Sequence, residues 1–280
     1  DLGLTTAKAD FPAVLNRIEA LLGLSPFDTI DTAELDRRRK AREAEQKAEG
    51  AAKARAIEKT LKRRQNAAQR LEDSLAEAYL HRRGIRVMPP QSFATYEGGH
   101  DPELVIWATD DTGVKRGGQG IALTDRTPRK LSFGNIGGFP ARLPGDAPDG
   151  PLFIAEGPET ALTVWQATGC ETWAVYGAGN FQSAPVPLWR TVIFCPDADA
   201  PDSPAGKAFL TACRKHIAQG VQLYIAQPGQ KQGSKKDLND TLQEQGEDAV
   251  KALLEAAQPF RDPDALPSAK EARESLQDAV

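Results

Sequence analysis

The sequence predicts an α/β protein in which a parallel sheet flanked by helices follows a small β-rich subdomain and a long N-terminal helical region. Three observations predict this organisation. Residues 32–83 contain a single Gly and no Pro, whereas residues 84–150 are rich in both. From residue 151 onward, short apolar runs alternate with helical segments. Apolar strands separated by helices are typical of a parallel sheet that is buried on both faces.

The N-terminal third is predicted to be helical. Residues 10–23 carry apolar side chains at helical spacing, with Asp10 as N-cap and Gly23 as the C-terminal stop. Residues 32–83 are rich in Ala, Glu, Lys, Arg and Gln, and these strong helix formers predict one long helix or two. Before Leu61, their apolar content is too low for a coiled-coil seam. Two interpretations stay open: a solvated helical linker, or a helix that follows a nucleic-acid backbone.

The next region is predicted to form the small β-rich subdomain. Its β-like runs lie at 103–108, 120–124 and 130–133. Turn signals rich in Asp and Gly separate these runs, which favours short strands joined by tight loops.

The last part is predicted to form the parallel sheet. Its strands are expected at 152–155, 172–176, 191–195 and 221–226, and its helices at 158–168, 203–219 and 238–257. A polar C-terminal tail follows. The predicted domains are therefore 1–83, 84–150, 151–257 and 258–280.

Composition limits the class of protein. No apolar run is long enough to span a membrane, and no signal peptide is present, so we expect a cytoplasmic protein with no membrane partner. The three cysteines are far apart and odd in number, which predicts neither a disulfide framework nor a zinc site. The net charge of −4 hides a segregation, because residues 37–86 are basic and the C-terminal third is acidic. The chain begins at Asp1, and we expect it to be a fragment of a longer protein.

Acidic residues directly follow three of the predicted strands. Glu156 follows the first, Asp197 and Asp199 follow the third, and Asp237 and Asp240 follow the fourth. Because the carboxyl ends of parallel strands meet at one edge of a sheet, these side chains are expected to converge. The alternative is that they only cap the N-termini of three helices.

Converging carboxylates repel one another, so a divalent cation is their natural partner. Mg²⁺ prefers oxygen ligands, and two such ions can stabilise both the attacking and the leaving oxygen of a phosphoryl transfer. Glu156 then suits proton transfer or binding of a second metal. Gly157 is expected to let the backbone turn sharply beside the site. No P-loop is present, since Gly206-Lys207 lacks the earlier Gly and is followed by Ala208.

These motifs carry a family resemblance. A Glu-Gly after an apolar strand, an Asp-x-Asp after a later strand and a Lys-Asp-x-x-Asp beyond it resemble the Toprim domain over residues 151–257. Residues 229–242 (GQKQGSKKDLNDTL) are similar to a segment of the Toprim primases of phages and plasmids, a bacterial-type group. Residues 113–134 look like the small basic subdomain that precedes Toprim in primases. Residues 1–23 are similar to the helix that follows the zinc-binding domain of such proteins.

The resemblance implies roles for individual residues. Glu156, Asp197 and Asp199 would be catalytic. The residues that would hold Mg²⁺ or Mn²⁺ are Glu156, Asp197, Asp199, Asp237 and Asp240. The residues that would bind the nucleotide are Arg116, Lys130, Lys236 and Gly157. The segment after Asp199 is longer and richer in Pro than the family's compact pattern, which affects the role of Gly206 and Lys207 more than that of the aspartates.

By this resemblance the chain is a DNA primase core that synthesises short primers from NTPs on single-stranded DNA by two-metal nucleotidyl transfer. A replicative helicase and an upstream zinc-binding module are implied as partners. Two alternatives stay open: a Toprim nuclease with the same acidic centre, and a non-catalytic DNA-binding replication subunit. A topoisomerase is disfavoured because 280 residues are too few for a strand-passage gate.

Overall fold

The computed structural model describes residues 32–90, 92–96, 101–124 and 129–264, together with six positions between 14 and 23. The chain divides into two compact units, residues 1–56 and 57–280, and each is described by itself. The helix predicted at 10–23 lies largely outside the described residues. Within the described part, no helix is both long and apolar enough to cross a membrane. The cellular location stays a prediction.

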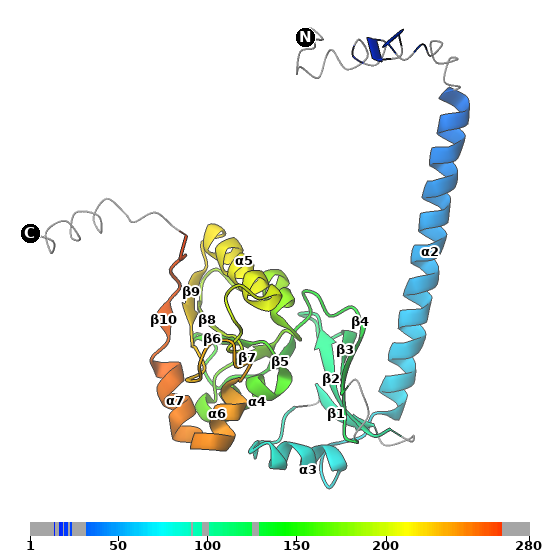
Figure 1. Ribbon diagram of the computed structural model, residues 1–280. Helices are drawn as coiled ribbons and strands as arrows, with labels where there is room; N and C mark the ends of the chain where they lie inside the picture. Colours follow the sequence, from blue (N-terminus) through cyan, green and yellow to red (C-terminus); the bar gives the residue numbers. More distant parts are fainter. Residues whose placement is uncertain are drawn as a thin grey trace, which may run out of the picture. The chain divides into compact units, whose positions relative to one another are not determined.

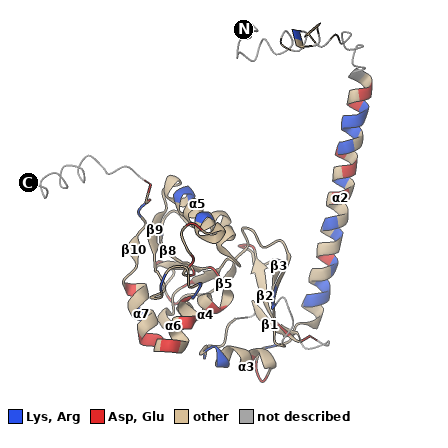
Figure 2. Cartoon of the chain, viewed as in Figure 1, with Lys and Arg blue, Asp and Glu red and all other residues tan. Residues whose placement is uncertain are grey.

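The region predicted as one long helix or two contains two. Helix α2 (Thr32–Ala67) is 36 residues long and is solvated along most of its length. Basic and acidic residues are interspersed along it (Figure 2), and Glu34 pairs with Arg38 one turn later at 2.9 Å. Helix α3 (Leu75–Arg82) starts at Ser74, whose hydroxyl accepts a hydrogen bond from the Glu77 N–H. No apolar stripe runs along α2, so packing of an apolar face does not explain this helix. Its composition of strong helix formers does.

The small subdomain is an antiparallel sheet in the order β1-β2-β3-β4 (Figure 1). Its strands are β1 (Phe93–Tyr96), β2 (Glu103–Thr109), β3 (Lys115–Ala122) and β4 (Lys130–Gly134). Strand β1 was not predicted. A Cβ at Gly118 of β3 would lie 2.4 Å from the Ile106 carbonyl oxygen, so this close strand approach requires glycine. The Arg64 guanidinium pairs with buried Glu103 and lies 4.3 Å from the centre of the Phe133 ring, which anchors the end of α2 to this sheet.

The second sheet has six strands in the order β10-β9-β8-β6-β7-β5. The predicted parallel sheet is confirmed by its four central strands, β6 (Leu152–Ala155), β7 (Thr172–Ala174), β8 (Thr191–Cys195) and β9 (Gln222–Ile225). Two antiparallel edge strands correct the sequence analysis, β5 (Ala141–Leu143) and β10 (Gln258–Pro259). No strand was predicted at either position, because residues 84–150 were assigned to the small subdomain and residues 258–280 to a polar tail.

Helices cover both faces of this sheet (Figure 1). Alternate residues of β6 and β8 point to opposite faces, as in any strand. One face packs against α4 (Pro158–Thr168), α6 (Leu238–Gln245) and α7 (Glu247–Glu255), and the other against α5 (Pro204–Ala218) and the 3₁₀ helix η2 (Ala178–Ser183). The single helix predicted at 238–257 is broken at Gly246, whose φ of 88° is left-handed.

Candidate active site

The acidic residues lie together at the carboxyl edge of the six-stranded sheet. Ala155 of β6 pairs with Cys195 of β8, so Glu156 and the Asp197–Asp199 loop begin at the same level. The loop before α6 joins them, because the Ala198 N–H donates to the Lys236 carbonyl at 2.8 Å. The predicted convergence of three strand ends is therefore present in the structure.

Burial and the charges of neighbouring carboxylates raise the pKa values of Asp197 and Glu156. Burial raises the pKa of Asp197 to about 8, and the charges of Glu156, Asp237 and Asp199 add to the shift. Burial also raises the pKa of Glu156, as do the charges of Asp199 and Asp237, although backbone N–H groups of Ala178 and Asp197 oppose the shift. Within the described residues, the buried Oδ1 of Asp197 has no hydrogen-bond partner. This cluster favours either a proton or a bound cation.

The carboxylate oxygens at this site suit an ion that takes its remaining ligands from water or substrate. In the described part of the chain, no group of three or more His, Cys, Asp or Glu side chains is arranged to hold a metal ion. Mg²⁺ commonly binds through one or two carboxylates and completes its shell with water and substrate phosphates. The orphaned oxygen of Asp197 and the nearby carboxylates of Asp199 and Glu156 match such a partial site.

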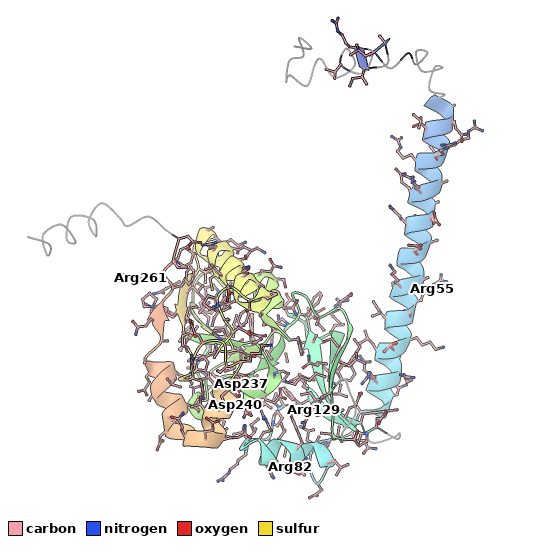
Figure 3. All side chains as sticks on the ribbon, viewed as in Figure 1. Arg55, Arg82, Arg129, Asp237, Asp240 and Arg261 are labelled. Atoms are coloured by element: carbon pink, nitrogen blue, oxygen red, sulfur yellow. The ribbon has the colours of Figure 1, made fainter. Side chains whose placement is uncertain are left out.

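Asp237 and Asp240 form a capping box at the start of α6 (Figure 3). The Asp240 N–H donates to Asp237 Oδ1 at 2.9 Å, and the Asp237 N–H donates to Asp240 Oδ2 at 3.0 Å. The charge of Asp237 still reaches Glu156 and Asp197. The helix-cap interpretation thus describes the geometry of this pair, and a metal-binding role for either residue stays a prediction.

The three basic side chains predicted to bind nucleotide phosphates differ in their position relative to the acidic residues. Lys130 of β4 forms an ion pair with Glu159 at 3.0 Å, and its charge also lowers the pKa of Asp197. Arg116 pairs with Asp110 at 2.7 Å in the small sheet. Lys236 pairs with Glu244 of α6. The charge of Lys130 reaches Asp197, whereas that of Lys236 reaches Asp240.

Glu159 is a buried partner of Lys130 that sequence reasoning did not single out. It lies in the first turn of α4 and is 3% exposed. The Tyr79 hydroxyl of α3 donates to its Oε1 at 2.9 Å, and Lys130 contacts its Oε2. Burial alone would raise the pKa of Glu159, but Lys130 and the hydrogen bonds lower it below its ordinary value. The Glu-Gly-Pro-Glu string was a weak signal, since acidic residues in a first helical turn are common.

Two glycine roles differ from expectation. The chain bends at Glu156 and Gly157, as predicted, but the φ of −113° and ψ of 158° at Gly157 are extended values that any residue adopts, so the bend does not require glycine. The unusual backbone lies instead at Tyr176 and Gly177, with φ of 64° and 126°, and the Gly177 N–H donates to the Glu156 carbonyl. Gly206 has a packing role, because a Cβ there would lie 2.3 Å from the Ala200 carbonyl oxygen.

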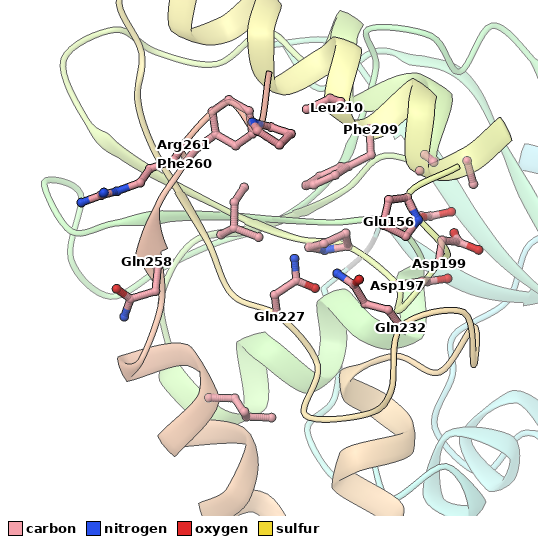
Figure 4. Close-up of a pocket in the computed structure, with 18 of the residues that line it drawn as sticks. Glu156, Asp197, Asp199, Phe209, Leu210, Gln227, Gln232, Gln258, Phe260 and Arg261 are labelled. Atoms are coloured by element: carbon pink, nitrogen blue, oxygen red, sulfur yellow. The ribbon is translucent and has the colours of Figure 1, made fainter. Parts of the chain in front are cut away.

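A cavity of about 570 Å³ opens beside the carboxylates (Figure 4). Its walls come from α5, the segment after β9, the end of α7 and the segment after β10. No motif indicated it, because its lining is assembled from parts of the chain that are far apart in sequence.

Residues 151–248 match the family model of the Toprim domain. The chain is also similar to a solved structure of the DnaG catalytic core, with a TM-score of 0.51 and 18% identity over 77% of this chain and 81% of that one. A DnaG primase catalytic domain bound to single-stranded DNA gives a TM-score of 0.49 and 17% identity over 83% and 92% of the two chains. No curated protein matches the sequence.

The zinc-binding and RNA polymerase domains of the Aquifex aeolicus primase give a TM-score of 0.48 and 16% identity over 74% of this chain. This chain spans 61% of the length of that structure. The chain contains a Toprim domain, and its mixed α/β architecture is that of a DnaG-type catalytic core. The predicted resemblance to the Toprim domain of bacterial-type primases is confirmed, whereas the resemblances drawn for residues 1–23 and 113–134 stay predictions.

Proposed function

We propose that this chain is the catalytic core of a DNA primase, which joins NTPs into short primers on single-stranded DNA. The observation that carries the proposal is the group of half-buried carboxylates of Glu156, Asp197 and Asp199 at the edge of a Toprim sheet, with the charge of Lys130 from the preceding subdomain acting on Asp197. Carboxylates that require a cation, together with a neighbouring lysine, suit a polyphosphate substrate.

The acidic residues would hold Mg²⁺ or Mn²⁺, with Asp197 and Asp199 as ligands and Asp237 beside them. Such ions supply Lewis-acid activation of a 3′-hydroxyl and charge stabilisation of the departing pyrophosphate. Burial raises the pKa of Glu156, so its carboxylate is a stronger base than an ordinary one and suits proton transfer. Lys130 would offset phosphate charge close to the reacting atoms.

The other nucleotide contacts are proposed further out. Arg116 and Lys236 are partly exposed, and each would exchange its present acidic partner for a phosphate. Gly157 would bring backbone close to the nucleotide, and its N-terminal position on α4 favours an anion. A single-stranded template, a replicative helicase and an upstream zinc-binding module are the proposed partners.

The test is primer synthesis from labelled NTPs on a single-stranded template. Asp197→Ala and Asp199→Ala are each expected to abolish Mg²⁺-dependent synthesis, because each removes a ligand oxygen from a site that has few. Asp202→Ala is the matched control, since Asp202 is exposed on the same loop and does not line the cavity beside the carboxylates. Full activity in both variants would refute the assignment.

Two alternative functions predict different reaction products on a gel. A Toprim nuclease would shorten labelled DNA in an Asp197-dependent manner and incorporate no NTP. A DNA-binding subunit would retain template without either reaction, and α2, in which Lys and Arg outnumber Asp and Glu, would carry the binding. A longer chain that includes any upstream module is tested beside this one.

A further inference from the structure

The carboxylate of Asp237 is held by a hydrogen bond on each of its two oxygens. The Asp240 N–H donates to Oδ1 at 2.9 Å, and the Thr160 hydroxyl donates to Oδ2 at 2.9 Å. The first bond belongs to the capping box of α6, whereas the second comes from a different helix, α4. The helix cap therefore explains one of these two contacts, and the bond from Thr160 needs a separate explanation.

Thr160 links two of the three acidic clusters. It lies in the first turn of α4, four residues after Glu156, and is completely buried. Its hydroxyl thus ties the helix that follows Glu156 to Asp237, the residue from which α6 begins (Figure 3). The two acidic clusters come from different strands, and this bond fixes one relative to the other.

The other two helical threonines in the second half of α4 use their hydroxyls differently. The Thr163 hydroxyl donates to the Glu159 carbonyl at 2.9 Å, and the Thr168 hydroxyl donates to the Val164 carbonyl at 2.8 Å. This bond to the carbonyl four residues earlier is the local partner that a helix offers to a threonine. Thr160 donates instead to a carboxylate of another element, so its hydroxyl serves more than the helix itself.

The charge of Asp237 reaches the acidic centre. It raises the pKa of Asp197 more than the charge of Asp199 does, although Asp199 belongs to the same loop as Asp197. It also raises the pKa of Glu156. Asp237 does not line the cavity beside these carboxylates, so it adds negative charge from the α6 side. Because the energy between charges falls with distance, this contribution depends on where the Asp237 carboxylate is held.

We propose that Thr160 is a positioning residue, which holds the Asp237 carboxylate towards Asp197 and thereby strengthens the binding of a divalent cation at the acidic centre. The inference rests on the proposed function for the presence of that cation. Groups that hydrogen-bond to the carboxylates of a metal site fix the orientation of those carboxylates and tune the affinity for the metal. Thr160 acts on the cation through Asp237.

The test measures the affinity of the full chain for Mn²⁺ without NTPs or template. Electron paramagnetic resonance, which detects free Mn²⁺, gives the Kd of the wild type, Thr160→Val and Thr160→Ser at one pH. Val has the branched shape of Thr without its hydroxyl, whereas Ser keeps the hydroxyl. Loss of such a partner typically weakens metal binding by about 10–100-fold, so we expect the Kd of Thr160→Val to rise about tenfold and that of Thr160→Ser to stay within about threefold of wild type.

Thr163→Val is the matched control. Thr163 is buried on the same helix, and its hydroxyl bonds to the Glu159 carbonyl and the Asn239 side chain rather than to the acidic centre. We expect Thr163→Val to lower the stability in urea unfolding and to leave the Kd for Mn²⁺ unchanged. A merely structural role of Thr160 would give this same pair of results for Thr160→Val. Thr160→Ala is a second variant without the hydroxyl, for use if Thr160→Val does not fold.

A double-mutant cycle tests whether Thr160 acts through Asp237. Asp237→Asn removes the charge and keeps the shape of the side chain, so it should weaken Mn²⁺ binding by itself. In that background, Thr160→Val should weaken binding no further, because the charge that it positions is already gone. The inference is overturned if the two losses add, if both variants without the hydroxyl bind Mn²⁺ like wild type, or if the wild type binds no Mn²⁺.

Failure of this inference is distinguishable from failure of the proposed function. A wild type that makes primers, but whose Mn²⁺ affinity does not respond to Thr160→Val, refutes the role of Thr160 alone. A wild type that makes no primers in either chain length, yet binds Mn²⁺ in a way that depends on the Thr160 hydroxyl, refutes the primase assignment and keeps the positioning role.

Discussion

Replacing Asp197 by Asn should stabilise the metal-free protein at high pH and not at low pH. The folded protein keeps a proton on Asp197 up to about pH 8, whereas the ordinary pKa is 3.8. Folding therefore takes up a proton between these values, and the free energy of unfolding falls as pH rises through this window. Asn mimics the protonated form, so the variant should lose this part of the pH dependence.

The size of the effect follows from the shift. From 3.8 to about 8 is roughly four pKa units, and at about 1.4 kcal/mol per unit the full linkage is about 6 kcal/mol. Part of the shift comes from the charges of Glu156, Asp237 and Asp199, and water that reaches a half-buried loop screens these charges. We expect Asp197→Asn to be more stable than wild type by about 2–4 kcal/mol at pH 8.5 and equal to it near pH 4.

Urea unfolding in EDTA, followed by circular dichroism at pH 4, 6 and 8.5, measures this difference. Asp202→Asn is the control, because Asp202 is exposed and does not touch the acidic centre. Adding Mg²⁺ at pH 8.5 should stabilise the wild type and not Asp197→Asn. If the stability difference between Asp197→Asn and wild type does not change with pH, the repulsion within this cluster has been overestimated and the argument for a cation fails.

Two further substitutions separate structural from functional roles. Asp240→Ala should cost about 1 kcal/mol in thermal or urea unfolding, because it removes one half of the α6 capping box. Primer synthesis should stay within about threefold of wild type, and a complete loss with native stability would instead make Asp240 a metal ligand. Tyr79→Phe should cost about 1–2 kcal/mol, since it removes a donor from buried Glu159. Tyr224→Phe is its control, and equal stability of the two variants would contradict this role of the hydroxyl.

The sequence predicted those parts of the fold that depend on local pattern. Apolar runs placed β6 and β8 correctly, and composition placed α2. It missed β5 and β10, because Ala-Arg-Leu and Gln-Pro contain no apolar run of the kind that identified the central strands. Their position depends on pairing with β7 and β9, which is a property of the folded chain.

The candidate site divides in the same way. The three acidic clusters could be predicted because strand ends in a parallel sheet share an edge, and this rule needs no side-chain geometry. The capping box at Asp237 was foreseen only as an alternative, since a capping aspartate and a metal-binding aspartate look alike in sequence. Glu159 was missed because its importance depends on Tyr79, 80 residues earlier, and on Lys130 of another sheet.

The contacts of Glu159 suggest how Lys130 is kept ready for a substrate. The two oxygens of Glu159 have different partners, with Tyr79 on Oε1 and Lys130 on Oε2. The Lys130 side chain is 45% exposed, so it can turn from Glu159 towards a phosphate at the acidic centre without leaving a buried cavity behind. Glu159 would then still accept a hydrogen bond from Tyr79, which limits the cost of a buried carboxylate that has lost its cation. On this reasoning, Tyr79 stabilises the nucleotide-free protein modestly and lowers the free-energy cost of moving Lys130 away from Glu159. Tyr79→Phe should therefore weaken nucleotide binding through Lys130, although the tyrosine lies outside the acidic centre.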